Sequence, residues 1–174
     1  LYTRELATRT PITRWIVCTN GPYRNFMNGM LEELTANYEF EGYWLDIPRS
    51  PFCYCDYCKK DYPEKTGKNF PDDIYSSEGL EYRKWHLALG TAIANSWAAT
   101  IRKIKPEVTI ASNGILYTWD FGWDALDAQD YPSREYHAKE GVASVSFYCL
   151  QQKALKRDVP FEIEIWRHSY GARE

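Results

Sequence analysis

Hydrophobic and polar positions follow two different periods along the chain. Apolar residues at three- and four-residue spacing predict amphipathic helices, which cover 23–38, 77–105 and 137–158. Short runs rich in β-branched and aromatic residues predict buried strands, which cover 14–20, 42–47, 108–113, 159–169 and a shorter segment at 124–128. Strands and helices therefore alternate along most of the sequence.

This alternation predicts a parallel α/β architecture, either a doubly wound sheet or a (β/α)8 TIM barrel. The glycine-rich phosphate loop of doubly wound folds follows none of the predicted strands. Polar residues instead collect where strands end, and barrels build their sites there. A full barrel needs about 250 residues, whereas this chain has 174. We therefore predict one domain over 1–174, the central part of a TIM barrel with about four to five βα units.

Composition and charge narrow the range of partners. The net charge is -3 and basic residues form no long stripe, which argues against nucleic acid as a partner. No apolar run reaches the length needed to cross a membrane. The sequence begins at Leu1 and shows no signal peptide, so a cytoplasmic protein and a secreted or periplasmic one with its signal removed both remain open. The sequence also leaves open whether the protein is a homo-oligomer and whether it is a piece of a longer chain.

Three cysteines lie within six residues in the motif Cys53-x-Cys55-x-x-Cys58. Thiolates at this spacing are typical of structural zinc sites, which need a fourth ligand. Cys18 lies near the end of the preceding predicted strand, and neighbouring strand ends of a parallel sheet lie close together. The sequence thus predicts a structural zinc ion that holds the loop after 42–47, with incidental loop thiols as the alternative. Cys149 is predicted to be a small buried apolar residue.

Asp46 ends the apolar run at 42–47, where alternation places it on the same face as Trp44. A carboxylate at the end of a buried strand is costly without a partner. Asp46 is thus a candidate catalytic residue, or else it caps a loop or pairs with Arg49.

The run YEFEGYWLDIP at 38–48 resembles the fourth strand of glycoside hydrolase barrels, above all of α-L-fucosidases. The stretch from Trp15 to Tyr62 is more similar still to a family known only as hypothetical glycosyl hydrolases. Members of that family carry the same cysteine motif after the strand-four acid. Certain β-galactosidases also hold zinc there, although they have Asn-Glu where this chain has Leu45-Asp46.

The resemblance implies a glycoside hydrolase in which Asp46 is the nucleophile and zinc is structural. It does not identify the second carboxylic acid; we rank Glu164 first and Asp127 second, with Asp124, Asp130 and Glu162 behind them. A sugar-binding role is predicted for Asn20, Tyr23, Trp44, Arg49, Asn113, Trp166 and His168. His86 is predicted to have a packing or surface role. The alternative function is a catalytically inactive carbohydrate-binding or scaffolding barrel of a larger protein, whereas a zinc ribbon for nucleic acid lacks a second cysteine pair.

Overall fold

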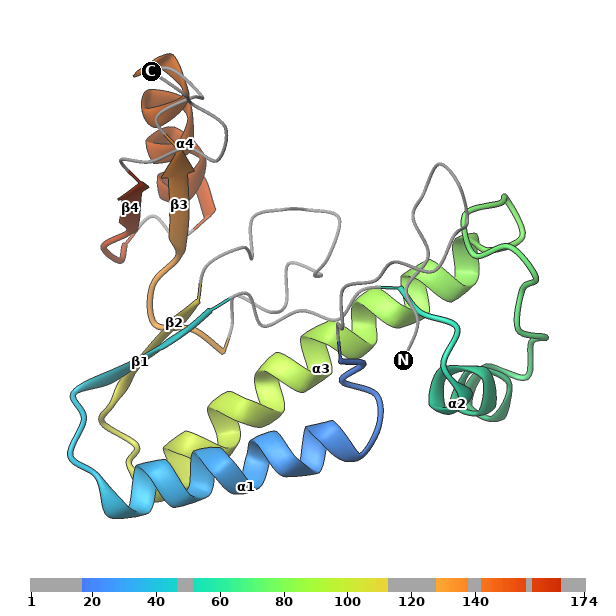
Figure 1. Ribbon diagram of the computed structural model, residues 1–174. Coiled ribbons are helices and arrows are strands. Elements are labelled where there is room, and N and C mark those ends of the chain that lie inside the picture. Colours follow the sequence, from blue (N-terminus) through green and yellow to red (C-terminus); the bar gives the residue numbers. More distant parts are fainter. Residues whose placement is uncertain (1–16, 47–51, 113–127, 138–141, 156–157, 167–174) are drawn as a thin grey trace, which may run out of the picture.

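The computed structural model describes residues 17–46, 52–112, 128–137, 142–155 and 158–166 (Figure 1). Within these ranges the chain forms four helices and four strands. The helices are α1 (Pro22–Asn37), α2 (Asp56–Thr66), α3 (Leu80–Ile104) and α4 (Val142–Leu155). The strands are β1 (Gly42–Leu45), β2 (Thr109–Ser112), β3 (Ser133–His137) and β4 (Glu162–Trp166).

The strands pair in parallel and in chain order. β1 pairs with β2, with Gly42 opposite Thr109, and β3 pairs with β4, with Ser133 opposite Glu162. The backbone N–H of Asp130 donates a hydrogen bond to the Ile110 carbonyl oxygen at 2.9 Å, which connects the segment before β3 to β2. In the described part of the chain these are two separate two-stranded sheets. The described residues thus have a parallel α/β architecture, and they do not form a closed barrel.

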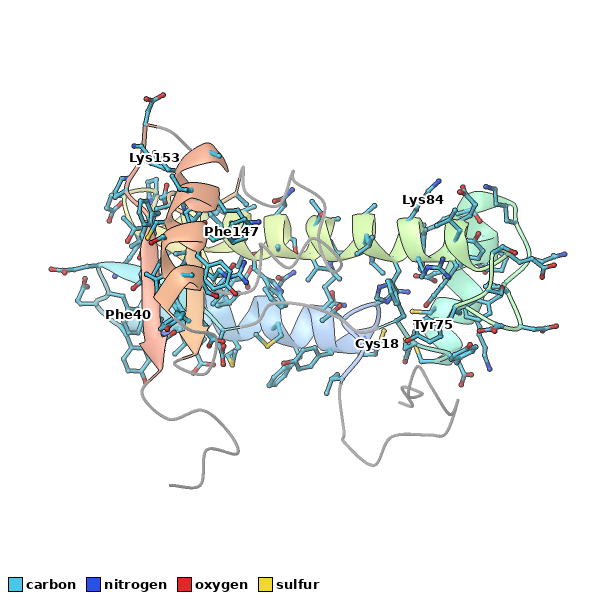
Figure 2. The ribbon with its side chains drawn as sticks, turned by 90° about the horizontal axis from the view of Figure 1, so that it is seen from above. Cys18, Phe40, Tyr75, Lys84, Phe147 and Lys153 are labelled. Atoms are coloured by element: carbon cyan, nitrogen blue, oxygen red, sulfur yellow. The ribbon has the colours of Figure 1, made fainter. Side chains whose placement is uncertain are left out.

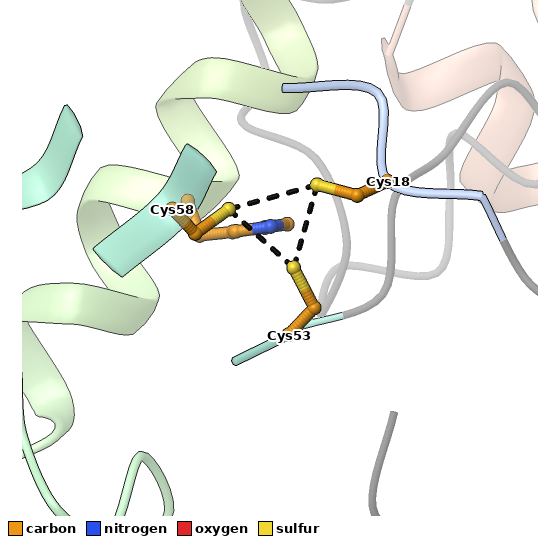
Figure 3. Close-up of side chains that lie close together, drawn as sticks. Cys18, Cys53 and Cys58 are labelled. Carbon is orange, nitrogen blue, oxygen red and sulfur yellow. Dashed lines mark hydrogen bonds between the residues drawn. The ribbon is translucent and has the colours of Figure 1, made fainter. Parts of the chain in front are cut away.

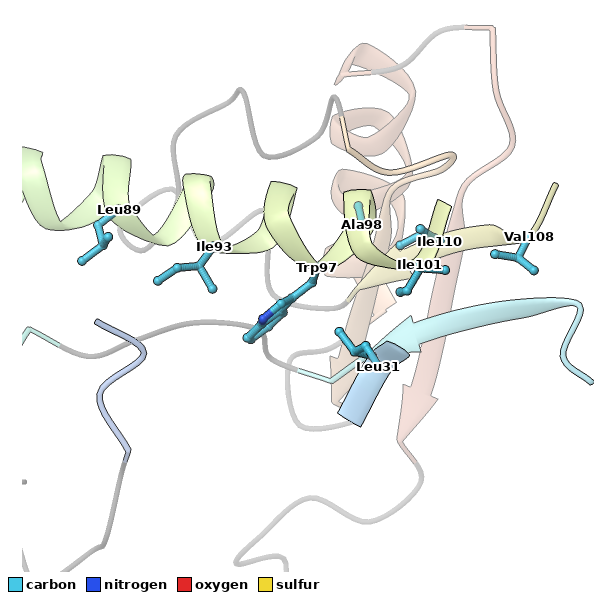
Figure 4. Packing of buried hydrophobic residues seen from close by; sticks show 8 residues of the cluster. All are labelled: Leu31, Leu89, Ile93, Trp97, Ala98, Ile101, Val108 and Ile110. Carbon is cyan, nitrogen blue, oxygen red and sulfur yellow. The ribbon is translucent and has the colours of Figure 1, made fainter. Parts of the chain in front are cut away.

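The main core lies between the α1–α3 helix pair and the β1–β2 sheet (Figure 4). The apolar stripe of α3 supplies Leu89, Ile93, Trp97, Ala98 and Ile101, and α1 contributes Leu31. Val108 and Ile110 cover the stripe from the sheet side, and Tyr43 and Leu45 of β1 pack against the same cluster. Burial of this continuous stripe is what fixes the helix pair on one face of the sheet.

The far ends of the helix pair carry different structures. Figure 2 shows Cys18 and Tyr75 near one end of α1 and α3, and Phe147 and Lys153 near the other. Helix α2 lies at the Cys18 end and is capped at its carboxyl end by Gly67, whose φ of 68° is in the left-handed region that favours glycine. The β3–β4 pair and α4 lie at the opposite end (Figure 1).

Most of the predicted elements are present, with corrections. The helices predicted at 23–38 and 77–105 correspond to α1 and α3, and β1, β2 and β4 lie inside predicted strands. The prediction that His137 begins a helix is wrong, because His137 ends β3 and α4 begins at Val142. The strand predicted at 14–20 is not present in its described part, because residues 17 and 18 have no regular structure and 19 and 20 form a bend. The strand at 124–128 falls outside the described residues except for Ala128, which lies in a turn.

Helix α2 and strand β3 were not predicted. Helix α2 buries only Cys58 and Tyr62 and contains Pro63, so its sequence has little helical periodicity. Strand β3 begins with two polar residues that are nonetheless buried, Ser133 and Arg134. None of the helices in the described ranges is long and apolar enough to cross a membrane.

Two isoleucines in the last turns of α3 test the core. Ile101 is fully buried, whereas Ile104 is 38% exposed. We expect Ile101→Ala to lower the free energy of unfolding by about 2–5 kcal/mol, because it removes buried methyl groups and leaves a cavity. Ile104→Ala, the matched control, should change it by about 0.5 kcal/mol or less. Urea unfolding of the full-length protein measures both, and equal losses would contradict this packing.

Candidate functional site

Four buried side chains from three parts of the chain meet beside α2. Cys18 precedes α1, Cys53 precedes α2, Cys58 lies in the first turn of α2, and His86 lies on α3. The three cysteines are at most 4% exposed and His86 is 2% exposed. One ligand atom from each of the four lies within 4.8 Å of the others. Figure 3 shows the three thiols facing one another.

The spacing of the sulfur atoms fits a tetrahedral metal ion. The Cys18 and Cys53 Sγ atoms are 3.3 Å apart, those of Cys53 and Cys58 are 3.4 Å apart, and those of Cys18 and Cys58 are 3.6 Å apart. All are free thiols. Four sulfurs about 2.3 Å from one tetrahedral ion would lie about 3.8 Å from each other. The distances are therefore close to those of a thiolate metal site.

Nearby donors favour negative charge on the thiols. The Asn20 backbone N–H donates to Cys18 Sγ at 3.4 Å, and the Asn20 side-chain amide donates to Cys58 Sγ at 3.7 Å. Cys55 is the N-cap of α2 and Cys58 lies in its first turn. The positive end of the helix dipole therefore points at this group and stabilises thiolates.

The thiols share their protons. Hydrogen bonds from Cys53, Cys55 and Cys58 lower the pKa of Cys18. The hydrogen bond to Cys18 is the main cause that raises the pKa of Cys53 and that of Cys58. For Cys55, the hydrogen bond with Cys18 raises the pKa, but those with Cys53 and Cys58 lower it, and the result is a pKa of about 7. The group thus titrates as a unit, and a metal ion would displace its protons.

Aromatic side chains enclose the cluster. Tyr82 is fully buried, and its hydroxyl donates to the Cys53 carbonyl oxygen at 2.7 Å. Its ring lies 4.8 Å from that of Phe70 and 5.7 Å from that of His86, and the ring of Phe52 meets His86 edge-on at 5.3 Å. Burial raises the pKa of Tyr82. These ring contacts bury His86 beside the thiols.

The structure brings together the predicted cysteines and adds a histidine. Cys18, Cys53 and Cys58 form the cluster, and the Cys55 Sγ lies 3.4 Å from that of Cys53. The prediction of a packing or surface role for His86 is incomplete, since its imidazole is buried beside the thiols. Asn20, predicted to bind sugar, contacts the thiols. Cys149 is half-buried on α4.

The face of the sheets opposite the described helices carries Trp44 of β1. Tyr43 and Leu45 pack on the helical core, so Trp44 points to the other side. There the Trp44 Nε1 donates to the Ser133 Oγ of β3 at 3.0 Å. Trp44 is 38% exposed. Asp46 lies in a bend directly after β1 and is exposed; if the alternation of β1 continued by one residue, its carboxylate would lie on the Trp44 side.

Two glutamates share that face on β3 and β4. Arg134 packs on the helical side, where its guanidinium carbon lies 3.5 Å from the Tyr148 ring centroid and its Nη1 donates to Gln151. Ser133 and Glu135 therefore point to the opposite side. Glu164 is the register partner of Glu135, so the two side chains are neighbours on one face. Sequence reasoning missed Glu135 because it did not predict β3.

The other predicted residues have varied outcomes. Arg49, Asn113, Asp127 and His168 lie outside the described residues, as does the side chain of Trp166. Tyr23 lines a pocket of about 370 Å³ together with Val17, Pro22, Phe26 and Tyr57. Asp130 accepts hydrogen bonds from the Ile110 backbone N–H at 2.6 Å and from Arg102 at 3.0 Å. That carboxylate has a structural role in connecting β2 to α3.

The described architecture has counterparts among solved glycosidase structures. A β-galactosidase from Rahnella sp. R3 superposes with a TM-score of 0.71 and 16% identity, over 95% of this chain and 32% of that one. A β-galactosidase from Bacillus circulans sp. alkalophilus superposes with a TM-score of 0.63 and 14% identity, over 85% of this chain and 29% of that one. The α-L-fucosidase isoenzyme 2 from Paenibacillus thiaminolyticus superposes with a TM-score of 0.52 and 16% identity, over 75% of this chain and 19% of that one.

These similarities define the fold of the chain. At such identities they show a shared fold alone, and the chain spans about a third of the length of the first of these proteins. The chain thus has the fold of part of these glycosidase structures. Comparison with models of known protein families and with curated protein sequences gives no match.

The thiol cluster generates a prediction about metal content. We expect the full-length protein, purified without chelator, to carry one metal ion per chain. Cys53→Ser should lose this ion, because Cys53 contacts every other thiol of the cluster. Removing the ion should lower the free energy of unfolding by about 3–4 kcal/mol where metal was present at 100–1,000 times its Kd.

Cys149→Ser is the matched control, because Cys149 lies on α4 and outside the cluster. It should keep the ion and the stability of the unchanged protein. Elemental analysis and urea unfolding, with and without chelator, measure both quantities. A Cys53→Ser variant that still carries one ion per chain would contradict the site.

Proposed function

We propose that the chain is the central part of a glycoside hydrolase barrel that cleaves a glycosidic bond with Asp46 and a second carboxylic acid. The observation that carries the proposal is the shared face described above. Trp44 and Glu164 belong to strands whose opposite faces pack against helices, and Asp46 directly follows the strand of Trp44. Barrel enzymes place catalytic groups at the carboxyl ends of their strands. The names of the similar structures, two β-galactosidases and an α-L-fucosidase, support the same chemistry.

Glycosidase chemistry assigns distinct tasks to two carboxyl groups. In a retaining enzyme one carboxylate attacks the anomeric carbon and the other acid protonates the leaving oxygen, with the groups about 5–5.5 Å apart. In an inverting enzyme the second carboxylate activates water and the gap is about 6.5–9.5 Å. We assign the nucleophilic role to Asp46 and the partner role to Glu164. Asp127 is the second candidate for the partner, and the Trp44 indole offers a flat surface for a sugar ring.

We further propose that the metal is zinc and that its role is structural. Thiolates are the ligands that select zinc among abundant divalent ions. The buried thiols and His86 leave no open coordination position for a substrate. The ion would connect the segment before α1 to the start of α2, and this holds the chain that follows Asp46. The residues of the cluster thus position the site and do not react with the sugar.

Acidic residues at the two ends of β1 test the role of Asp46. Asp46 follows the strand at its carboxyl end, whereas Glu41 precedes it at the amino end, and both are exposed. Asp46→Asn should reduce turnover of an aryl glycoside by about 10²–10⁴-fold or more, because it removes the reacting carboxylate. Glu41→Gln, the control, should leave turnover within about twofold, since active sites lie at the other strand end. Aryl fucosides and galactosides are the first substrates to assay in the full-length protein.

Unchanged turnover in Asp46→Asn would contradict the mechanism. Sugar binding without any turnover in the unchanged protein would favour the inactive carbohydrate-binding barrel instead.

The partner acid is tested on β4. Glu164→Gln should lower kcat by about 10²–10⁴-fold, whereas Glu162→Gln should lower it less than about tenfold. Both side chains lie on one face by alternation, but Glu164 is nearer the carboxyl end. If the chain uses Glu164 as the acid, the alkaline limb of the kcat–pH profile should disappear in Glu164→Gln. Equal effects of the two substitutions would remove Glu164 from this role.

A further inference from the structure

The metal centre offers more ligands than one tetrahedral ion accepts. Cys18, Cys53 and Cys58 have sulfur atoms 3.3–3.6 Å apart, and they form three corners. Two groups compete for the fourth corner. The Cys55 Sγ is 3.4 Å from that of Cys53, and a ring nitrogen of His86 lies within 4.8 Å of all three core sulfurs. A structural zinc ion takes four ligands, so one of the two is surplus.

The surroundings of His86 favour a role as a metal ligand. Its side chain is 2% exposed, and its Nε2 is buried without a hydrogen-bond partner among the described residues. A buried polar nitrogen without a partner costs about 1–3 kcal/mol, and a metal ion bound through that nitrogen would satisfy it. The rings of Phe52 and Tyr82 hold the imidazole beside the thiols.

Cys55 is the thiol best placed to leave the ion. It is half-buried, whereas the other three cysteines are buried. It is also the N-cap residue of α2 and therefore lies at the edge of the cluster, next to the loop. Water and thiol reagents reach this sulfur more easily than the core thiols. Replacement of one thiolate by a neutral imidazole also reduces the negative charge of the buried site.

We propose that Cys55 and His86 are alternative fourth ligands of the same ion. Cys55 completes the site together with the three core thiolates, and His86 takes the corner when the Cys55 thiolate is lost. The inference rests on the proposed metal centre and concerns a divalent ion of the zinc type. As a consequence, the metal-mediated connection between the segment before α1 and helix α2 persists when the Cys55 thiol, the most accessible of the four, is lost.

The test uses the full-length protein loaded with Zn²⁺ or Co²⁺. The variants are C55A, H86Q and the double variant C55A/H86Q, with C53S as the reference for a lost core ligand. C55A and H86Q should each retain one ion per chain, and C55A/H86Q should lose it. In Co²⁺-loaded C55A the thiolate-to-cobalt absorption should decrease from that of four thiolates to that of three, and the ligand-field bands should shift as one nitrogen enters. H86Q should keep the four-thiolate spectrum.

Two results would overturn the inference. If C55A loses the ion as completely as C53S, His86 cannot replace the thiolate. If C55A/H86Q retains the ion as well as C55A does, the replacing ligand is not His86. Metal binding by H86Q alone shows that the buried Gln still permits folding, and circular dichroism checks this in the double variant. An unchanged protein without metal would instead contradict the metal centre itself, so the two failures are distinguishable.

Discussion

The packing of three thiols against one another is the constraint on which this part of the molecule depends. Cys18, Cys53 and Cys58 come from two segments far apart in the sequence, and their sulfurs lie within 3.6 Å of each other in a buried pocket. Uncompensated, such a group of polarisable and partly charged atoms would repel and take up protons. A single divalent ion bound by the thiols would compensate this repulsion and displace their protons. Such an ion would hold the segment before α1 against the start of α2.

The second constraint is the division of the sheets into a helical face and an open face. The α1–α3 pair covers one side of β1 and β2, and α4 covers the same side of β3 through Arg134. Because side chains alternate along a strand, Trp44 and Glu164 point to the opposite side. In a complete barrel that side is the interior, which is why carboxylates on it are candidates for chemistry. The described residues form four strands paired in parallel, and the chain covers 32% of the Rahnella β-galactosidase and 19% of the α-L-fucosidase.

The sequence predicted those features whose cause is local. The stripes of α1 and α3 and the apolar runs of β1, β2 and β4 are visible as periodicity, and the motif Cys53-x-Cys55-x-x-Cys58 carries its spacing within six residues. Features caused by contacts between distant segments could not be read in this way. His86 resembles a helix-packing residue until the loop with Cys53 and the segment with Cys18 fold against it. Strand β3 was missed because Arg134 is buried by stacking on Tyr148 of α4, which its own sequence does not reveal.

The central claim is that an ion bound by these thiols holds the segment before α1 against α2. Anomalous diffraction from crystals of the full-length protein, measured on both sides of the zinc absorption edge, tests it most directly. The account predicts one strong difference peak per chain, centred among the sulfurs of Cys18, Cys53 and Cys58. Ordered density for these sulfurs without any metal peak, or with disulfide bonds between them, would contradict it.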